Sequence, residues 1–168
     1  MEIALLNKSV LRIKGKTTTF SINPSEASGA NAALMLDDSI YLLSSEETVV
    51  LQGPGEYEVG GVKITGTRGD KGVLYSMNME GLDIIIGKIA TLSAMQHKLK
   101  EHMVVISLCD EPTDAAFLTS LALNVVLFYG EKAEEIANGF AKENVKQMNK
   151  YSVALNKLPV EVETVLLS

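Results

Sequence analysis

The first half of the chain alternates short apolar runs with turn-forming residues, a pattern typical of β-structure. The first three runs lie at 3–6, 10–14 and 17–22. Asn7-Lys8 separates the first two runs, Gly15-Lys16 predicts a tight hairpin between the next two, and Asn23-Pro24-Ser25 ends the third. The same pattern predicts further strands at 32–36, about Tyr41, 49–51, 56–59, 62–67, 73–79 and 82–86.

The second half of the chain alternates helical and strand patterns. Leu92, Met95 and Leu99 recur at helical spacing and predict a helix over 91–101. The pattern also predicts helices at 112–121 and 131–146, and strands at 104–108, 125–129, 151–155 and 162–167. Because the runs 104–108 and 125–128 are apolar almost throughout, we expect them to be buried on both faces, with helices outside. The whole chain, 1–168, is therefore predicted to be one α/β domain with two packed sheets.

The stretch 53–61, Gly-Pro-Gly-Glu-Tyr-Glu-Val-Gly-Gly, is the most distinctive part of the sequence. Four glycines and one proline bracket a short alternating segment, which predicts strand, tight turn, strand, Gly-Gly corner and strand. The stretch does not fit a phosphate-binding loop, because it lacks a Gly-Lys-Ser/Thr ending and its Glu56 and Glu58 side chains would repel phosphate.

The net charge and the cysteine content limit the expected binding partners and the expected cellular compartment. The formal net charge is −6, so nucleic acid is not an expected partner. No apolar run is long enough to span a bilayer, and the first residues lack the pattern of a signal peptide, so we expect no membrane attachment. A single cysteine, Cys109, excludes an internal disulfide and favours a reducing cytoplasm.

Once these elements are placed, their order resembles that of the metallo-β-lactamase fold superfamily, nearest the small ascorbate-lactonase-like metal-dependent hydrolases. The stretch 53–66 resembles the "GPGEYEVGGVKI-G" segment of that branch, and 13–24, 80–84 and 158–167 resemble its opening hairpin, a later strand turn and its closing strand. The resemblance implies a shortened αββα sandwich of two mixed sheets with outer helices. It also implies a two-metal site whose ions hold and acidify a bridging water.

The metal ligands that the resemblance implies are missing. The family pattern supplies an H-x-H-x-D-H loop, a His after the glycine hairpin, an Asp in a "GD" motif and a final His. Histidine is absent from the matching segments at 37–41, 67–71 and 127–130. Lys88 stands where the bridging Asp is expected, and a cation there opposes metal binding. The segment between Asp38 and Val49 is also too short for the full metal loop and its helix.

Other groups leave two alternatives open for a site. Asp37 and Asp38 could form an all-carboxylate Mg²⁺ or Ca²⁺ site, together with Asp70 or with the acidic pair at 110–111. Alternatively, they could be the solvated acids of a turn that ends a strand. Cys109 follows an apolar strand, where it could be reactive or a small buried hydrophobe. The two histidines, at 97 and 102, are five residues apart and do not form a same-face pair.

The sequence therefore predicts a catalytically silent member of the superfamily, with no catalytic residue, no cofactor and no metal. Such a pseudoenzyme would act as a binding or scaffold module for an unknown ligand or protein partner, with a homodimer as one form it could take. The alternative is a metal-dependent hydrolase with a rearranged acidic site that binds a divalent metal through Asp37, Asp38 and Asp70.

Overall fold

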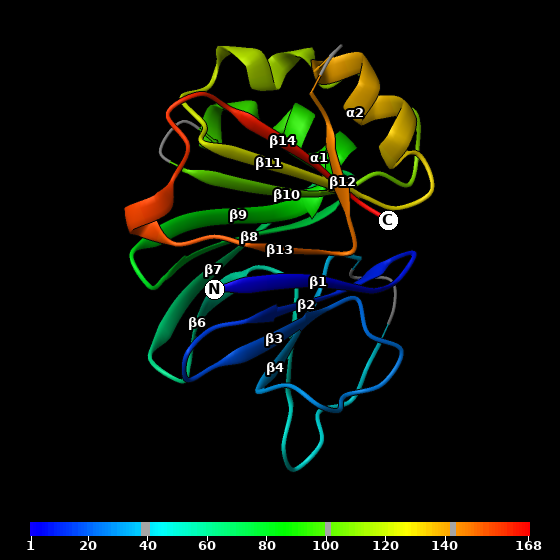
Figure 1. Ribbon diagram of the computed structural model, residues 1–168. Coiled ribbons are helices and arrows are strands. Elements are labelled where there is room, and N and C mark those ends of the chain that lie inside the picture. The colour runs from blue at the N-terminus through cyan, green and yellow to red at the C-terminus, as the bar shows by residue number, and fades with distance from the viewer. Residues whose placement is uncertain (38–40, 100–101, 142–143) are drawn as a thin grey trace.

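The computed structural model describes residues 1–37, 41–99, 102–141 and 144–168, which form two mixed β-sheets packed face to face (Figure 1). The six-stranded sheet has the order β13-β1-β2-β3-β4-β5, and the eight-stranded sheet has the order β12-β14-β11-β10-β9-β8-β7-β6. The strands of the six-stranded sheet are β1 (Glu2–Asn7), β2 (Val10–Lys14), β3 (Thr19–Ile22), β4 (Ala32–Met35), β5 (Val49–Gln52) and β13 (Lys150–Ser152). Those of the eight-stranded sheet are β6 (Gly55–Val59), β7 (Val62–Gly69), β8 (Gly72–Met79), β9 (Leu82–Lys88), β10 (Val104–Leu108), β11 (Val125–Tyr129), β12 (Lys146–Met148) and β14 (Glu163–Leu167).

Apolar side chains that alternate along the strands fill the space between the sheets. Ile13 and Phe20 from the six-stranded sheet belong to the same buried cluster as Ile84, Ile106 and Leu127 from the eight-stranded sheet. The alternation places one set of side chains of each strand in this central core, as the period of two requires. The two-sheet α/β sandwich predicted from the sequence is therefore confirmed.

The described α-helices, α1 (Ile89–Ala94) and α2 (Ala133–Ala141), pack on the outer face of the eight-stranded sheet (Figure 1). A second buried cluster lies beneath them and includes Leu92, Val105 and Val126. The strands β10 and β11 are consequently buried on both faces, as predicted. Three short 3-10 helices complete the described elements: η1 (Gln96–Lys98), η2 (Ala116–Ser120) and η3 (Leu155–Lys157). None of the described helices is long and apolar enough to cross a membrane.

Several element boundaries differ from the sequence prediction. The expected strand near Tyr41 is wrong, because the described residues 41–45 form no regular structure. The expected helix over 91–101 is divided into α1 and η1, since Met95 leaves the helical conformation with φ −112° and ψ 25°. The expected helix over 112–121 is only the 3-10 helix η2. Short segments such as these gain too little from their own hydrogen bonds, so packing decides their form.

The glycine-rich stretch is the point where the chain passes from one sheet to the other. β5 belongs to the six-stranded sheet and β6 to the eight-stranded sheet, and Gly53-Pro54 joins them. Gly53 has φ +91°, and a Cβ added at Gly66 would lie 2.6 Å from the Gly53 carbonyl oxygen. The predicted order of strand, turn, strand, corner and strand is confirmed, and the glycines permit the close approach that this crossing requires.

The buried Tyr75 of β8 joins the two sheets next to this crossing. Its hydroxyl lies 2.9 Å from the carbonyl oxygen of Leu51 and 3.2 Å from that of Met35, and its single proton is shared between these two acceptors. Since both carbonyls belong to the six-stranded sheet, this hydroxyl fixes the relative position of the sheets close to the end of β4.

Candidate functional site

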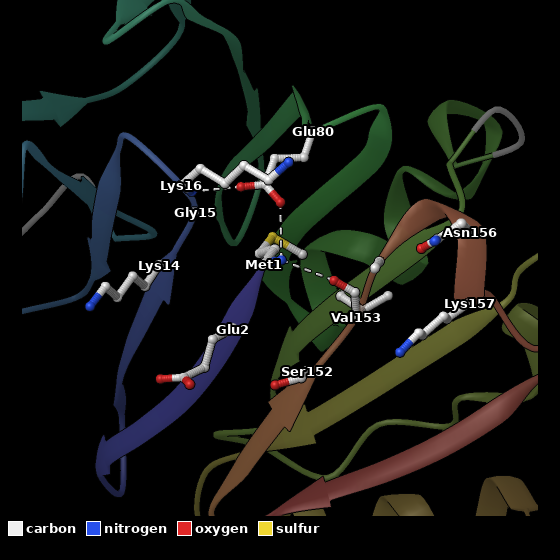
Figure 2. A pocket seen from close by; sticks show the side chains of 11 residues that line it. Met1, Glu2, Lys14, Gly15, Lys16, Glu80, Ser152, Val153, Asn156 and Lys157 are labelled. Atoms are coloured by element: carbon white, nitrogen blue, oxygen red, sulfur yellow. Dashed lines mark hydrogen bonds and ion pairs between the residues drawn. The ribbon is translucent and has the colours of Figure 1, made fainter.

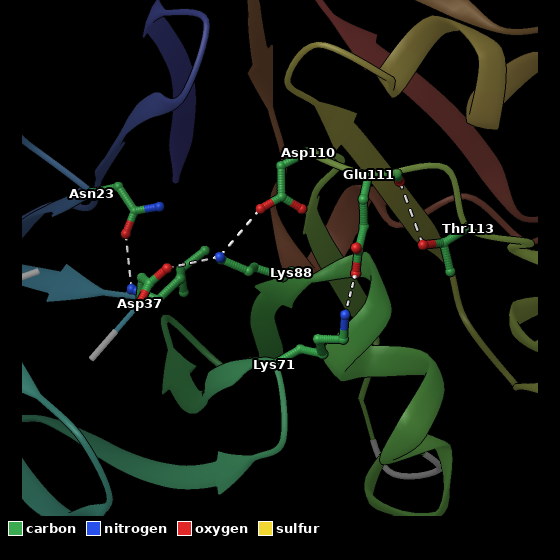
Figure 3. Close-up of polar contacts among 8 residues, drawn as sticks. Asn23, Asp37, Lys71, Lys88, Asp110, Glu111 and Thr113 are labelled. Atoms are coloured by element: carbon green, nitrogen blue, oxygen red, sulfur yellow. Dashed lines mark hydrogen bonds and ion pairs between the residues drawn. The ribbon is translucent and has the colours of Figure 1, made fainter. Parts of the chain in front are cut away.

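Three charged side chains meet at one edge of the sandwich, where strands from both sheets end (Figure 3). Lys88 is the last residue of β9, Asp110 follows the parallel neighbour β10, and Asp37 follows β4 of the other sheet. Because the carboxyl ends of neighbouring parallel strands share an edge, Lys88 and Asp110 lie together. The Lys88 Nζ lies 3.0 Å from Asp37 Oδ2 and 3.2 Å from Asp110 Oδ2, so one ammonium bridges two carboxylates.

The environment keeps this ammonium charged. Burial disfavours the charged form of Lys88, whose side chain is 17 % exposed. The hydrogen bond to Asp37 and the charge of Asp110 outweigh that penalty, so the pKa of Lys88 is raised above its ordinary value of 10.5. Lys88 is therefore a cation at neutral pH and cannot serve as a general base there.

The backbone around Asp37 is held by neighbours on both sides. The side-chain Oδ1 of Asn23 accepts a hydrogen bond from the Leu36 N–H at 2.8 Å, and the Leu36 carbonyl accepts one from the Val73 N–H at 2.9 Å. Gly72 allows the second approach, because a Cβ there would collide with the Leu36 carbonyl oxygen. The position of Asp37 is thus set by contacts to β8 and to the segment that follows β3.

A cleft remains at this edge of the sandwich. It has a volume of about 470 Å³. Its charged lining residues are Lys8, Asp37, Lys88, Asp110 and Glu131. A neighbouring cavity of about 670 Å³ shares Lys8 and Glu131 with it. The edge that corresponds to the implied metal site is therefore open to small molecules.

The other acidic residues considered from the sequence do not join Asp37 in the cleft. Asp70 lies on the exposed turn between β7 and β8 and is not among the residues that line the cavity. Glu111 instead pairs with Lys71 at 3.5 Å (Figure 3). Asp38 lies outside the described residues. Within the described part of the chain, no three His, Cys, Asp or Glu side chains converge as a metal ligand group would.

The residues considered as ligands or nucleophiles elsewhere lie away from the cleft or are inert. His97 is part of η1, and His102 precedes β10, at the opposite end of that strand from Asp110. The first and last residues of this five-residue strand are about 13 Å apart. Cys109 is fully buried, and burial raises the pKa of its thiol to about 12, so the nucleophilic thiolate is not formed at neutral pH.

Sequence reasoning did not pair Asp110 with Lys88, and it did not single out the hydroxyl of Tyr129. Tyr129 ends β11 at the same edge; its hydroxyl is buried and makes no hydrogen bond to the described residues. Burial raises the pKa of this phenol. The order of elements could have pointed to both residues. Three neighbouring parallel strands end at the same edge, and functional groups often follow such strand ends.

A further cavity, of about 640 Å³, lies at the opposite end of β2 and β8 (Figure 2). The Glu80 carboxylate accepts hydrogen bonds from the Met1 ammonium at 3.1 Å and from the Lys16 N–H at 2.6 Å. Burial opposes the charged form of Glu80, but these donors hold its pKa below the ordinary value of 4.5. The donors and the carboxylate satisfy one another, so we interpret this cluster as structural.

The donor set of the cleft does not fit the two-metal site that the family resemblance implied. The described cleft residues offer two carboxylates, and both are engaged by the Lys88 ammonium. Zinc in proteins is usually held by about four ligands that include His or Cys, and neither type is found among the described residues that line the cleft. An ammonium between the two carboxylates also repels an incoming metal ion.

Comparisons with known proteins show the fold. No family model and no curated protein matches the chain. Among solved structures, it is similar to a candidate Zn-dependent hydrolase of the metallo-β-lactamase superfamily from Thermotoga maritima. The TM-score is 0.75 and the identity 16 %, covering 99 % of this chain and 98 % of that one.

A second solved structure extends the likeness. It is a candidate metal-dependent hydrolase from Parabacteroides distasonis, with a TM-score of 0.55 and 11 % identity, covering 97 % of this chain and 92 % of that one. These values confirm the predicted resemblance at the level of the fold. The chain therefore has the fold of the metallo-β-lactamase superfamily.

Proposed function

We propose that this chain is a catalytically silent protein of the metallo-β-lactamase fold, and that its cleft binds a ligand or partner rather than hydrolysing one. The observation that carries the proposal is the Lys88 ammonium, which lies 3.0 Å and 3.2 Å from the carboxylates of Asp37 and Asp110. A metal-dependent hydrolase needs ions that lower the pKa of a bound water, and here the chain's own cation holds the acidic groups.

The states of Lys88 and Cys109 support binding more than catalysis. Lys88 is protonated at neutral pH and the Cys109 thiol is buried, so neither supplies a base or nucleophile. The cavity nevertheless persists, and it combines charged side chains with apolar ones such as Met35 and Leu108. Such mixed lining is common in sites that bind small molecules.

The second candidate is a metal-dependent hydrolase with a rearranged acidic site. It is favoured by one observation: Asp37 and Asp110 approach the same point from different sheets. This function would require Lys88 to leave that point when a divalent metal binds.

Two further parts of the proposal rest on the cysteine and on exposed apolar side chains. We place the protein in a reducing cytoplasm, because its one cysteine is a buried free thiol.

We also propose that the protein can form a homodimer, because Tyr41, Leu43 and Val49 expose apolar surface near one another in the chain. Light scattering across a concentration series tests the dimer, and a constant monomer mass would reject it.

One experiment separates the two candidate functions. The protein is purified without chelator, and bound Zn, Mn, Fe, Mg and Ca are quantified. The melting temperature is then measured with and without each divalent ion. The silent protein should carry no stoichiometric metal, and its melting temperature should not respond. A stoichiometric metal together with metal-dependent hydrolysis of an ester or lactone would overturn the proposal in favour of the hydrolase.

A further inference from the structure

The Lys88 Nζ marks a point in the cleft that is built to hold a positive charge. Asp37 approaches it from the end of β4 and Asp110 from the end of β10, so the two carboxylates come from opposite sheets. The side chains of Asp37 and Asp110 are 30 % and 40 % exposed, so both are partly shielded from water. Two partly shielded carboxylates therefore face one positive charge, each from a different sheet.

The backbone that carries Lys88 is fixed. Lys88 is both the end of β9 and the N-cap of α1. A Cβ at the preceding Gly87 would overlap the end of the Leu74 side chain and lie in ordinary contact with Leu92. On the other side, the Leu36 N–H and carbonyl anchor Asp37. The backbone on both sides is therefore held by the fold, and the Lys88 ammonium is held between the two carboxylates by its ion pairs.

We propose that Lys88 is a tethered cation that fills a latent cation site, and that a free small cation will occupy this site when the lysine side chain is removed. The inference rests on the proposed function, because it assumes that the wild-type cleft is not a working metal centre. It goes further by assigning a role to the lysine: it supplies the positive charge that joins the two sheets at the cleft.

The chemistry of the two partners defines the class of cation. Asp37 and Asp110 offer oxygen donors, which are the ligands preferred by Ca²⁺ and Mg²⁺, and they also accept hydrogen bonds from small alkylammonium ions. Among the described residues, the lining contains no His or Cys, so zinc is not expected to be favoured. The cavity of about 470 Å³ gives such ions a path to the site.

The test compares two truncations of the same side chain. Lys88→Ala removes the charge and leaves space for an ion, whereas Lys88→Met removes the charge but keeps a side chain of similar length. Melting temperatures are measured in Ca²⁺, Mg²⁺ or methylammonium chloride against sodium chloride of matched ionic strength. We expect Lys88→Ala to melt several degrees below wild type, and millimolar Ca²⁺ or methylammonium to restore at least half of that loss.

Three controls make the result specific to this point. Wild type and Lys88→Met should show no comparable response to the same cations. Adding Asp110→Asn to Lys88→Ala should abolish the rescue, since one of the two carboxylates is then neutral. Should Lys88→Ala fail to fold in sodium chloride, refolding with and without the cation gives the same comparison, and recovery only with the cation supports the proposal.

The outcomes also separate this inference from the proposed function. A stoichiometric metal in the wild type would overturn the silent-protein proposal itself. A metal-free wild type combined with a Lys88→Ala variant that ignores added cations would overturn only the latent site. An equal response of Lys88→Ala and Lys88→Met would overturn it as well, because it would show a general salt effect.

Discussion

Replacing Lys88 by Met tests how much the bridging ammonium stabilises the sandwich. The substitution keeps the length and apolar stem of the side chain and removes only the charge. At 3 Å and an effective dielectric constant of about 20, each ion pair corresponds to about 5 kcal/mol before desolvation. Since Asp37 and Asp110 are 30 % and 40 % exposed and the ammonium is itself desolvated, most of this cancels.

The repulsion between the two carboxylates, about 6 Å apart, amounts to about 1–3 kcal/mol between the aqueous and the protein-like dielectric limits. It is present in both proteins, so the difference between them is set by the two lost ion pairs. We therefore expect Lys88→Met to lower the free energy of unfolding by about 2 kcal/mol in total. For a domain of this size, that corresponds to a melting temperature about 4–8 °C lower.

Urea unfolding at low ionic strength measures this loss, and its pH dependence gives a second check. The pKa of Lys88 is raised in the folded protein, so the stability it contributes is fully present below pH 10.5 and is lost as the pH rises through the raised pKa. The gap between wild type and Lys88→Met should therefore persist at neutral pH and close in strong alkali. It should also be smaller when Asp37→Asn is present in both proteins. A variant within about 0.5 kcal/mol of wild type at neutral pH would refute the reasoning.

Three further predictions concern other parts of the sandwich. Gly66→Ala should destabilise the protein by about 1–3 kcal/mol, because its Cβ would lie 2.6 Å from a backbone carbonyl oxygen. The matched control Gly139→Ala, in open space on α2, should stabilise it by up to about 1 kcal/mol. Thermal melts compare the two variants. Tyr75→Phe should cost about 1–2 kcal/mol in urea unfolding, since two buried carbonyls lose their donor. Glu80→Gln should lower stability at neutral pH, and because the pKa of Glu80 is depressed, the difference from wild type should shrink as the pH falls below 4.5.

Much of the fold could be predicted because its signals are local. The alternation along the strands and the glycines between 53 and 61 encode extended segments and tight turns within a few residues. The assignment of β5 and β6 to different sheets was not encoded locally, because it depends on which strands pair over long distances. The helical pattern over 91–101 overestimated one element, since Met95 departs from helical geometry where tertiary packing overrides propensity.

The candidate site, too, could be predicted only in part from the sequence. The sequence already placed Lys88 where a metal-binding acid was expected and marked Asp37 and Asp110 as acidic candidates. It could not show that the three side chains meet, because they come from strands of two sheets and are up to 73 residues apart in the chain. Asp70 shows that a sequence motif does not establish spatial proximity. The sequence grouped it with Asp37, yet it lies on an exposed hairpin turn outside the cavity lining.

The metal content of the wild-type protein, purified without chelator, tests the silent-protein proposal most directly. Elemental analysis of a sample of known protein concentration gives the number of ions per chain. If the Lys88 ammonium occupies the position between Asp37 and Asp110, the protein should carry well under one equivalent of any transition or divalent metal, and its melting temperature should not change with EDTA. One or two equivalents of metal, lost with EDTA together with several degrees of melting temperature, would contradict the proposal.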